Sequence, residues 1–269
     1  MAQHILENEY LRVVIADEGA ELIMTKDSYY CASDGHGAPD EWRVHSGAKF
    51  SMFGEFKIYN FNAEIDEGAT MVFAPWNIYF RHDTWQHSYI HNSGDLFIPD
   101  DLIFTEGTGG GSFTIRQLAG TLTLGGALSK NGQDGKYKIE LNGGTVRTTG
   151  DVSVDFTEAR ITGDIALHAE EGSLFDFSGF SADDGVVVTK TGDGDVVLGQ
   201  ASEVETIKVL KGSVLLRKGG NDISNAVFEE GGKIKIGEAG TTLEFWVVSI
   251  SSASFVAAKN FSPLNGETV

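Results

Sequence analysis

The chain has 269 residues, including 34 glycines, 4 prolines and a single cysteine, and its formal net charge is −19 at pH 7. Glycine is thus nearly twice as frequent as the usual share of about 7%, which, with 41% hydrophobic residues, excludes a disordered or collagen-like chain and favours a β-protein with many tight turns. The acidic charge offers no basic stripe for a phosphate backbone, so we expect no nucleic-acid partner.

Membrane and export signals are not visible in the sequence. No run of residues approaches the roughly 18 apolar residues of a membrane-spanning helix, so we expect no membrane insertion by this chain. The first ten residues, MAQHILENEY, lack the basic and apolar regions of a signal peptide. The one cysteine, Cys31, cannot form an internal disulfide, which fits a cytosolic protein and equally a secreted bacterial repeat protein.

A glycine followed by a short alternating strand recurs along nearly the whole chain. Successive units are 18 to 28 residues apart, and an imperfect repeat in the low twenties is typical of a solenoid. Four of the units carry two acidic residues before the glycine: Asp17-Glu18-Gly19, Asp66-Glu67-Gly68, Glu170-Glu171-Gly172 and Glu229-Glu230-Gly231.

The first third of the chain differs from the rest in composition. Residues 29–104 contain three of the four tryptophans and five of the seven histidines. We therefore expect residues 1–106 to form an aromatic-rich cap or binding end, because the open end of a solenoid needs a cap for solubility. Residues 107–269 are expected to form regular glycine-rich coils of the same continuous domain.

The densest group of candidate binding residues lies between positions 76 and 91. Aromatic rings there could stack against sugar rings while imidazole and carboxylate groups bond to hydroxyls, although packing within a cap is the simpler alternative. The histidines could also bind a metal, but on a strand their spacing would require a loop that folds back, so we expect no metal or other cofactor. The candidate ligand-binding residues are Trp76, Tyr79, His82, Asp83, Trp85, His87, Tyr89 and His91.

The regular part of the chain alternates apolar residues with polar ones. Ile207-Lys208-Val209, followed by Val214 and Leu216, places one face of each strand inward and the other outward. One unit buries too little apolar surface to fold alone, so the coils must stack and pair in parallel. The predicted fold is all-β, a parallel β-helix; the alternative is an antiparallel β-sandwich or jelly roll, which also has many short strands.

One segment carries a recognisable motif. Lys190-Thr191-Gly192-Asp193-Gly194 is followed by the apolar strand Val196-Val197-Leu198, and a second strand runs through Ile207 to Gly212-Ser213-Val214. This arrangement resembles the autotransporter-associated β-strand repeat. The resemblance implies a right-handed β-helix that is extracellular or lies on a bacterial cell surface. The family has no shared catalytic residues, so the resemblance implies none here.

We therefore expect a non-enzymatic module for adhesion, whose partner is an extracellular glycan, a mucin, or a host or bacterial surface protein. The alternative is a secreted hydrolase that cleaves glycan or peptide and uses carboxylates in a groove. The acidic turn residues, such as Asp66 and Glu170, are expected at corners rather than in a cleft. No Gly-x-Ser-x-Gly nucleophile motif is present, and we predict no catalytic residue.

Overall fold

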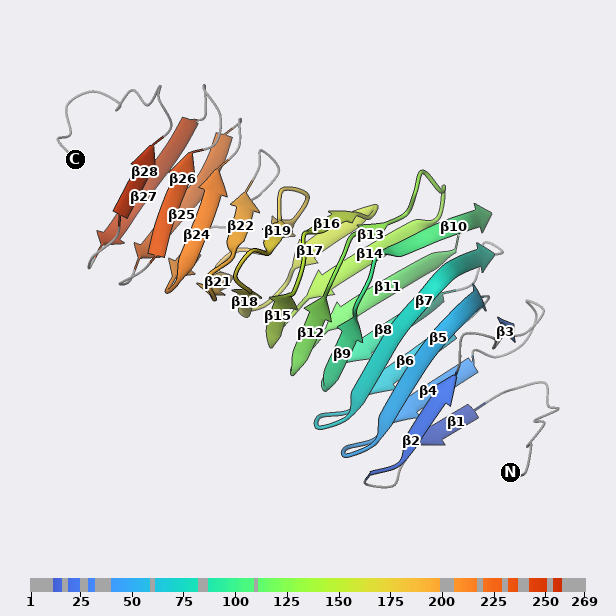
Figure 1. Ribbon diagram of the computed structural model, residues 1–269. Helices are drawn as coiled ribbons and strands as arrows, with labels where there is room; N and C mark the ends of the chain where they lie inside the picture. The colour runs from blue at the N-terminus through green and yellow to red at the C-terminus, as the bar shows by residue number, and fades with distance from the viewer. Residues whose placement is uncertain are drawn as a thin grey trace.

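The computed structural model describes residues 12–15, 19–24, 29–31, 40–58, 61–81, 87–108, 111–198, 206–216, 220–228, 232–236, 242–250 and 254–257. These residues form strands and turns, with no helix that could cross a membrane. Each strand pairs in parallel with its equivalent one coil away. The predicted β-helix is confirmed: the coils stack into a parallel β-solenoid with β1 and β28 at opposite ends (Figure 1).

Three faces surround the core of the solenoid. Face A is an eight-stranded parallel sheet. Its strands, in spatial order, are β1 (Arg12–Ile15), β4 (Asp40–Val44), β6 (Phe61–Ile65), β8 (His87–Asn92), β11 (Ser112–Gln117), β14 (Lys136–Leu141), β17 (Glu158–Ile161) and β20 (Ser181–Ala182).

Face B follows face A in each coil and continues further along the solenoid. Its strands are β2 (Glu21–Met24), β5 (Lys49–Ile58), β7 (Thr70–Arg81), β9 (Asp95–Ile98), β12 (Thr121–Leu124), β15 (Thr145–Thr148), β18 (Ile165–Ala169), β21 (Val187–Thr191), β23 (Thr206–Val209), β25 (Gly220–Phe228) and β27 (Thr242–Ile250).

Face C closes each coil. It contains β3 (Tyr29–Cys31), β10 (Leu102–Thr108), β13 (Leu128–Ser129), β16 (Val152–Asp155), β19 (Leu174–Asp176), β22 (Asp195–Leu198), β24 (Gly212–Leu216), β26 (Gly232–Ile236) and β28 (Ser254–Ala257). The long strands β5 and β7 belong to both faces, since each pairs with a strand of face B and a strand of face C. Within the described ranges face A ends at β20, and the later coils alternate between faces B and C.

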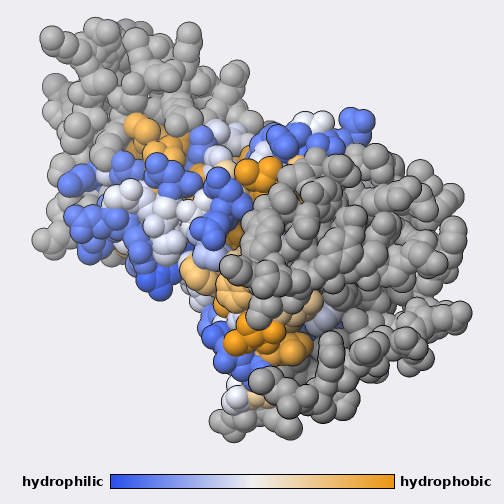
Figure 2. All heavy atoms as spheres, turned by 45° about the vertical axis from the view of Figure 1, so that its right-hand side comes forward, coloured by the Kyte–Doolittle hydropathy of each residue, from blue (hydrophilic) through white to orange (hydrophobic). Residues whose placement is uncertain are grey.

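The core follows directly from the alternation in the sequence. In β8, β11 and β14, every second side chain is buried and the others are at least partly exposed. Aromatic residues of the first coils stack inside: the rings of Trp42 and Phe50 lie 4.9 Å apart, and those of Phe61 and Phe73 lie 6.3 Å apart. Part of the aromatic enrichment in the first third therefore fills the core. Outside, hydrophilic residues cover much of the described surface, with apolar areas between them (Figure 2).

The repeated glycines form two separate corners rather than one register. Gly94, Gly120 and Gly144 follow one another at the corner between faces A and B, where the amide of Thr121 donates to Gly94 (2.8 Å) and that of Thr145 donates to Gly120 (2.9 Å). A different column, between faces B and C, contains Gly194, Gly212 and Gly232. The glycine-strand unit that recurs in the sequence therefore does not occupy the same corner in every coil. The sequence does not separate the two columns, because both corners use glycine with positive φ, +63° at Gly120 and +74° at Gly212.

Candidate ligand-binding face

Three of the predicted binding residues lie side by side on the outside of face A. His87, Tyr89 and His91 are the partly exposed residues of β8, and the residues between them are buried. Trp76 and Tyr79 belong to β7, but their side chains are outside the described part of the structure. His82, Asp83 and Trp85 lie outside the described residues altogether.

The outward residues of β8 form a three-by-three grid with those of the next two strands. His87 is in register with Ser112 and Lys136, Tyr89 with Thr114 and Lys138, and His91 with Arg116 and Glu140. From the usual strand spacing and rise, the grid measures about 10 Å across the strands and about 13 Å along them. We call these nine residues the outer grid: His87, Tyr89, His91, Ser112, Thr114, Arg116, Lys136, Lys138 and Glu140.

An aromatic pair lies on the first strand of the outer grid. The rings of Tyr89 and His91 stack with their centroids 4.0 Å apart and their planes 17° from parallel. Partial burial, and then the nearby charge of Arg116, lowers the pKa of His91 below its usual 6.5. Partial burial, and then the charges of Glu64 and Glu41, raises the pKa of Tyr89 above 10.0. Both rings are therefore uncharged at neutral pH.

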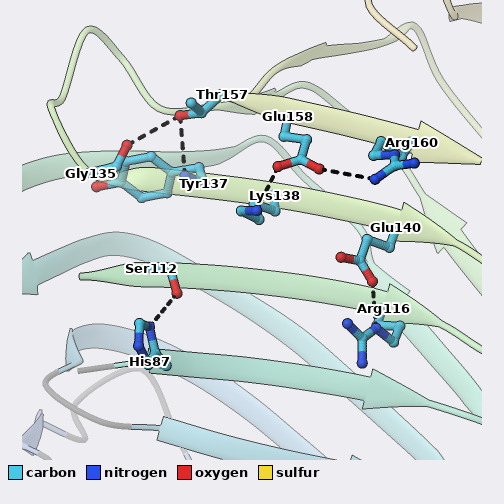
Figure 3. A network of polar contacts seen from close by, with 10 residues as sticks. All are labelled: His87, Ser112, Arg116, Gly135, Tyr137, Lys138, Glu140, Thr157, Glu158 and Arg160. Carbon is cyan, nitrogen blue, oxygen red and sulfur yellow. Dashed lines mark hydrogen bonds and ion pairs between the residues drawn. The ribbon is translucent and has the colours of Figure 1, made fainter. Parts of the chain in front are cut away.

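Hydrogen bonds and ion pairs between successive coils hold most of the other grid side chains (Figure 3). His87 Nδ1 lies 2.8 Å from Ser112 Oγ, and Arg116 Nε donates to Glu140 Oε2 at 2.6 Å. Lys138 Nζ donates to Glu158 Oε2 at 2.5 Å, on the following strand. Exposed ion pairs of this kind contribute only about 0–1 kcal/mol each to stability, so their main effect is to orient the side chains.

The carboxylate that opens the turn Asp66-Glu67-Gly68 is also paired with cations. Asp66 accepts hydrogen bonds from Arg43 (3.2 Å) and contacts His45 Nδ1 at 2.6 Å. Partial burial by itself raises the pKa of Asp66, but the hydrogen bonds and charges of Arg43 and His45 outweigh it, so the net pKa lies below 3.8. Such a carboxylate remains ionised and is unsuited to act as a general acid.

The same pairing recurs in two other turns. Glu170 pairs with Arg147, and Asp183 pairs with Arg160 at 2.5 Å. As with Arg43 and Asp66, the arginine precedes its acid by 23 residues, about one coil. The acidic residue that opens these turns thus has a structural role between neighbouring coils.

The outer grid does not have the geometry of a metal site. His87 and His91 are four residues apart on one strand, about 13 Å by the usual rise, which is too far to ligate one ion. Within the described ranges, no cluster of three or more His, Cys, Asp or Glu side chains could hold a metal.

Six of the nine grid residues could not be found from local sequence patterns. Ser112, Thr114 and Arg116, with their equivalents on β14, belong to the part of the chain predicted to be regular coil. The sequence signal for these neighbours is the spacing of the coils, because His87, Ser112 and Lys136 are outward residues that follow one another by one coil. In the grid, β8 and β11 are direct neighbours in one parallel sheet, although they lie on either side of residue 107 in the chain.

No family model, curated protein or solved structure matches this chain. The resemblance to the autotransporter-associated repeat therefore depends on the residues of the motif itself. In the structure these residues build the corner between faces B and C, where Lys190 is fully buried and Gly192 and Gly212 have positive φ.

Proposed function

We propose that this protein is a non-enzymatic binding module that holds an extracellular glycan on the outer grid of face A. The observation that carries the proposal is the uncharged Tyr89–His91 pair among oriented polar side chains. Sugars combine apolar ring faces with many hydroxyl groups, so they bind where aromatic rings adjoin hydrogen-bonding groups. The hydroxyls of Ser112 and Thr114 and the imidazole of His87 provide such groups beside the pair.

The shape of face A also supports binding of an extended chain. The parallel sheet presents equivalent outward positions on successive strands, so a linear glycan can lie across several coils. His91 covers one ring face of Tyr89, and we propose that a sugar packs against the other face. Binding in this manner needs no catalytic group.

The state of the carboxylates favours binding over hydrolysis. A glycosidase needs two carboxyl groups that flank the bond to be cleaved, and one of them must be protonated. On face A, Glu140 and Glu158 are paired with Arg116 and Lys138, and the turn carboxylate Asp66 has a lowered pKa.

For location, we propose a bacterial cell-surface or secreted protein similar to an autotransporter passenger. The parallel solenoid and the Lys190–Gly194 motif at its corner support this proposal. On a cell surface, the same face would serve adhesion to glycan-bearing partners such as mucins or host and bacterial surface proteins. Surface labelling of the native cells with an impermeant reagent tests the location.

The binding proposal can be tested with a glycan array that includes mucin glycans. We expect Tyr89→Ala to weaken binding of the best ligand tenfold or more, since loss of an aromatic anchor costs about 2 kcal/mol at binding hot spots. His168→Ala is the matched control, because His168 lies on β18 of face B. Circular dichroism must show that both variants remain folded. If no glycan binds, or if Tyr89→Ala binds as well as the wild type, the proposal fails.

A further inference from the structure

Positive charge is concentrated on the outer grid of an otherwise acidic chain. The grid contains three cations, Arg116, Lys136 and Lys138, and one carboxylate, Glu140. Its formal charge is therefore three minus one, or +2, whereas the whole chain carries −19. Including the charged residues in register on the two flanking strands, which are Glu64 beside His91, Glu158 beside Lys138 and Arg160 beside Glu140, leaves +1. An anion that approaches the protein is thus repelled by most of the molecule and attracted to this area.

Lys136 differs from the other two cations of the grid. Arg116 and Lys138 each bond to a carboxylate. Lys136 is exposed at the start of β14, and its ammonium group has no ion pair or hydrogen bond in the described part of the chain. An unpaired ammonium can bind an incoming anion without breaking an existing ion pair, so it is the natural contact for a charged ligand group.

Lys136 is also at a suitable distance from the aromatic pair. It lies two strands away from β8 and two residues along the strand from Tyr89, which corresponds to about 12 Å between Cα atoms. A lysine side chain spans part of that distance. A sugar ring against Tyr89 therefore places the next unit of the same glycan near Lys136, with Ser112 and Thr114 between them.

We infer that the ligand of the outer grid is an anionic glycan, with one sugar ring against Tyr89 and an acidic group of a neighbouring unit at Lys136. This rests on the proposed function and adds the class of glycan. The acidic group is a carboxylate of a uronic acid or a sulfate, because either anion can accept hydrogen bonds from an ammonium group. The contact is exposed, so it is screened by salt and its effect is modest.

Three hexasaccharides with one backbone test the inference by calorimetry: carboxyl-reduced chondroitin, which is neutral, unsulfated chondroitin, and chondroitin 4-sulfate. At low salt we expect an anionic form to bind roughly three- to fivefold more tightly than the neutral form, the effect of one exposed ion pair. Lys136→Gln should remove this preference, so that the anionic and neutral forms bind the variant about equally. Lys208→Gln is the control, because Lys208 is exposed on β23 of face B.

The outcomes separate this inference from the proposed function. A preference for unsulfated chondroitin identifies the carboxylate, and a preference that appears only with chondroitin 4-sulfate identifies the sulfate; both support an anionic ligand. Equal binding of all three forms, or equal effects of Lys136→Gln and Lys208→Gln, overturns the inference while glycan binding stands. If none of the three binds and the glycan array is also negative, both fail.

Discussion

The ammonium group of Lys190 donates a hydrogen bond to the carbonyl oxygen of Lys211 in the next coil, at 3.1 Å. It also donates to the carbonyl oxygens of Thr191 (2.6 Å) and Gly192 (2.8 Å). The side chain of Lys190 is 0% exposed, so a buried cation supplies donors to three backbone oxygens at the corner between faces B and C. This is the lysine of the motif that resembles the autotransporter-associated repeat.

The buried lysine should make stability depend on pH. Burial lowers the pKa of Lys190 from 10.5 to about 8, with smaller opposing effects from Asp195 and Asp193. Between these two values the unfolded chain holds a proton that the folded protein has lost, so the free energy of unfolding rises with pH. Below pH 8 both states are protonated and the cost of burial is fully present. The pKa shift corresponds to an increase in the free energy of unfolding of up to roughly 3 kcal/mol by pH 10.5.

Urea unfolding at pH 7.5, 9 and 10.5 measures this effect. Other titrating groups also contribute, so the informative quantity is the difference in the free energy of unfolding between the wild type and Lys190→Met. As pH rises, this difference should change in favour of the wild type. Lys208→Met, at an exposed position on face B, should keep the wild-type dependence. Parallel pH profiles for the wild type and Lys190→Met would contradict the predicted pKa shift.

The stacking of coils was predictable because glycine and the alternation of apolar residues are local signals. The position of each coil relative to the next was not. Along face B, the step between equivalent residues varies from 28 residues, between Glu21 and Lys49, to 19, between Thr189 and Lys208. With such variation, a sequence pattern cannot decide which residues become lateral neighbours, and that information defines the outer grid.

The alternation of β21 carries a signal for the inward position of Lys190. Val188 and Lys190 are two residues apart on β21, and both are buried, so the alternation itself places the lysine inside. A lysine at an inward position is rare unless it has hydrogen-bond acceptors. The nearby glycine turn supplies those acceptors through its backbone carbonyl groups, which carry no residue-specific signal in the sequence.

The corner that receives Lys190 should not tolerate a side chain at Gly212. Gly212 has φ +74°, and a Cβ there would lie 2.4 Å from the carbonyl oxygen of Gly192 and 2.7 Å from Lys190 Nζ. We expect Gly212→Ala to destabilise the fold by about 2–5 kcal/mol, from left-handed strain and from crowding together. Gly212→Val should be worse, because a β-branched residue is larger and stiffer.

A second glycine separates strain from crowding. Gly172 has almost the same backbone, φ +78°, but a Cβ at this position would have no heavy atom within 4 Å outside its own residue and the two adjacent ones. Gly172→Ala should therefore cost only the left-handed strain, about 1–2 kcal/mol. Thermal or urea unfolding of both variants gives the comparison. Equal losses of stability at Gly172 and Gly212 would show that the neighbouring coil does not crowd the corner.

The ionisation of His91 tests the geometry of the outer grid without any ligand. Partial burial and the charge of Arg116 lower the pKa of His91, while Glu64 and Glu140 raise it to a smaller extent. We expect the imidazole signals of His91 in an NMR titration to give a pKa below 6.5. Arg116→Gln should raise this pKa, because it removes a positive charge and leaves Glu140 without its partner.

A change at a distant arginine provides the control for this titration. Arg147 lies on β15 of face B and pairs with Glu170, so Arg147→Gln should leave the pKa of His91 unchanged. If Arg116→Gln also leaves it unchanged, then Arg116 is not the neighbour that the register of β8 and β11 requires. The outer grid would then lose the row that joins the aromatic pair to its cations, and with that row the physical basis for an anionic glycan on face A.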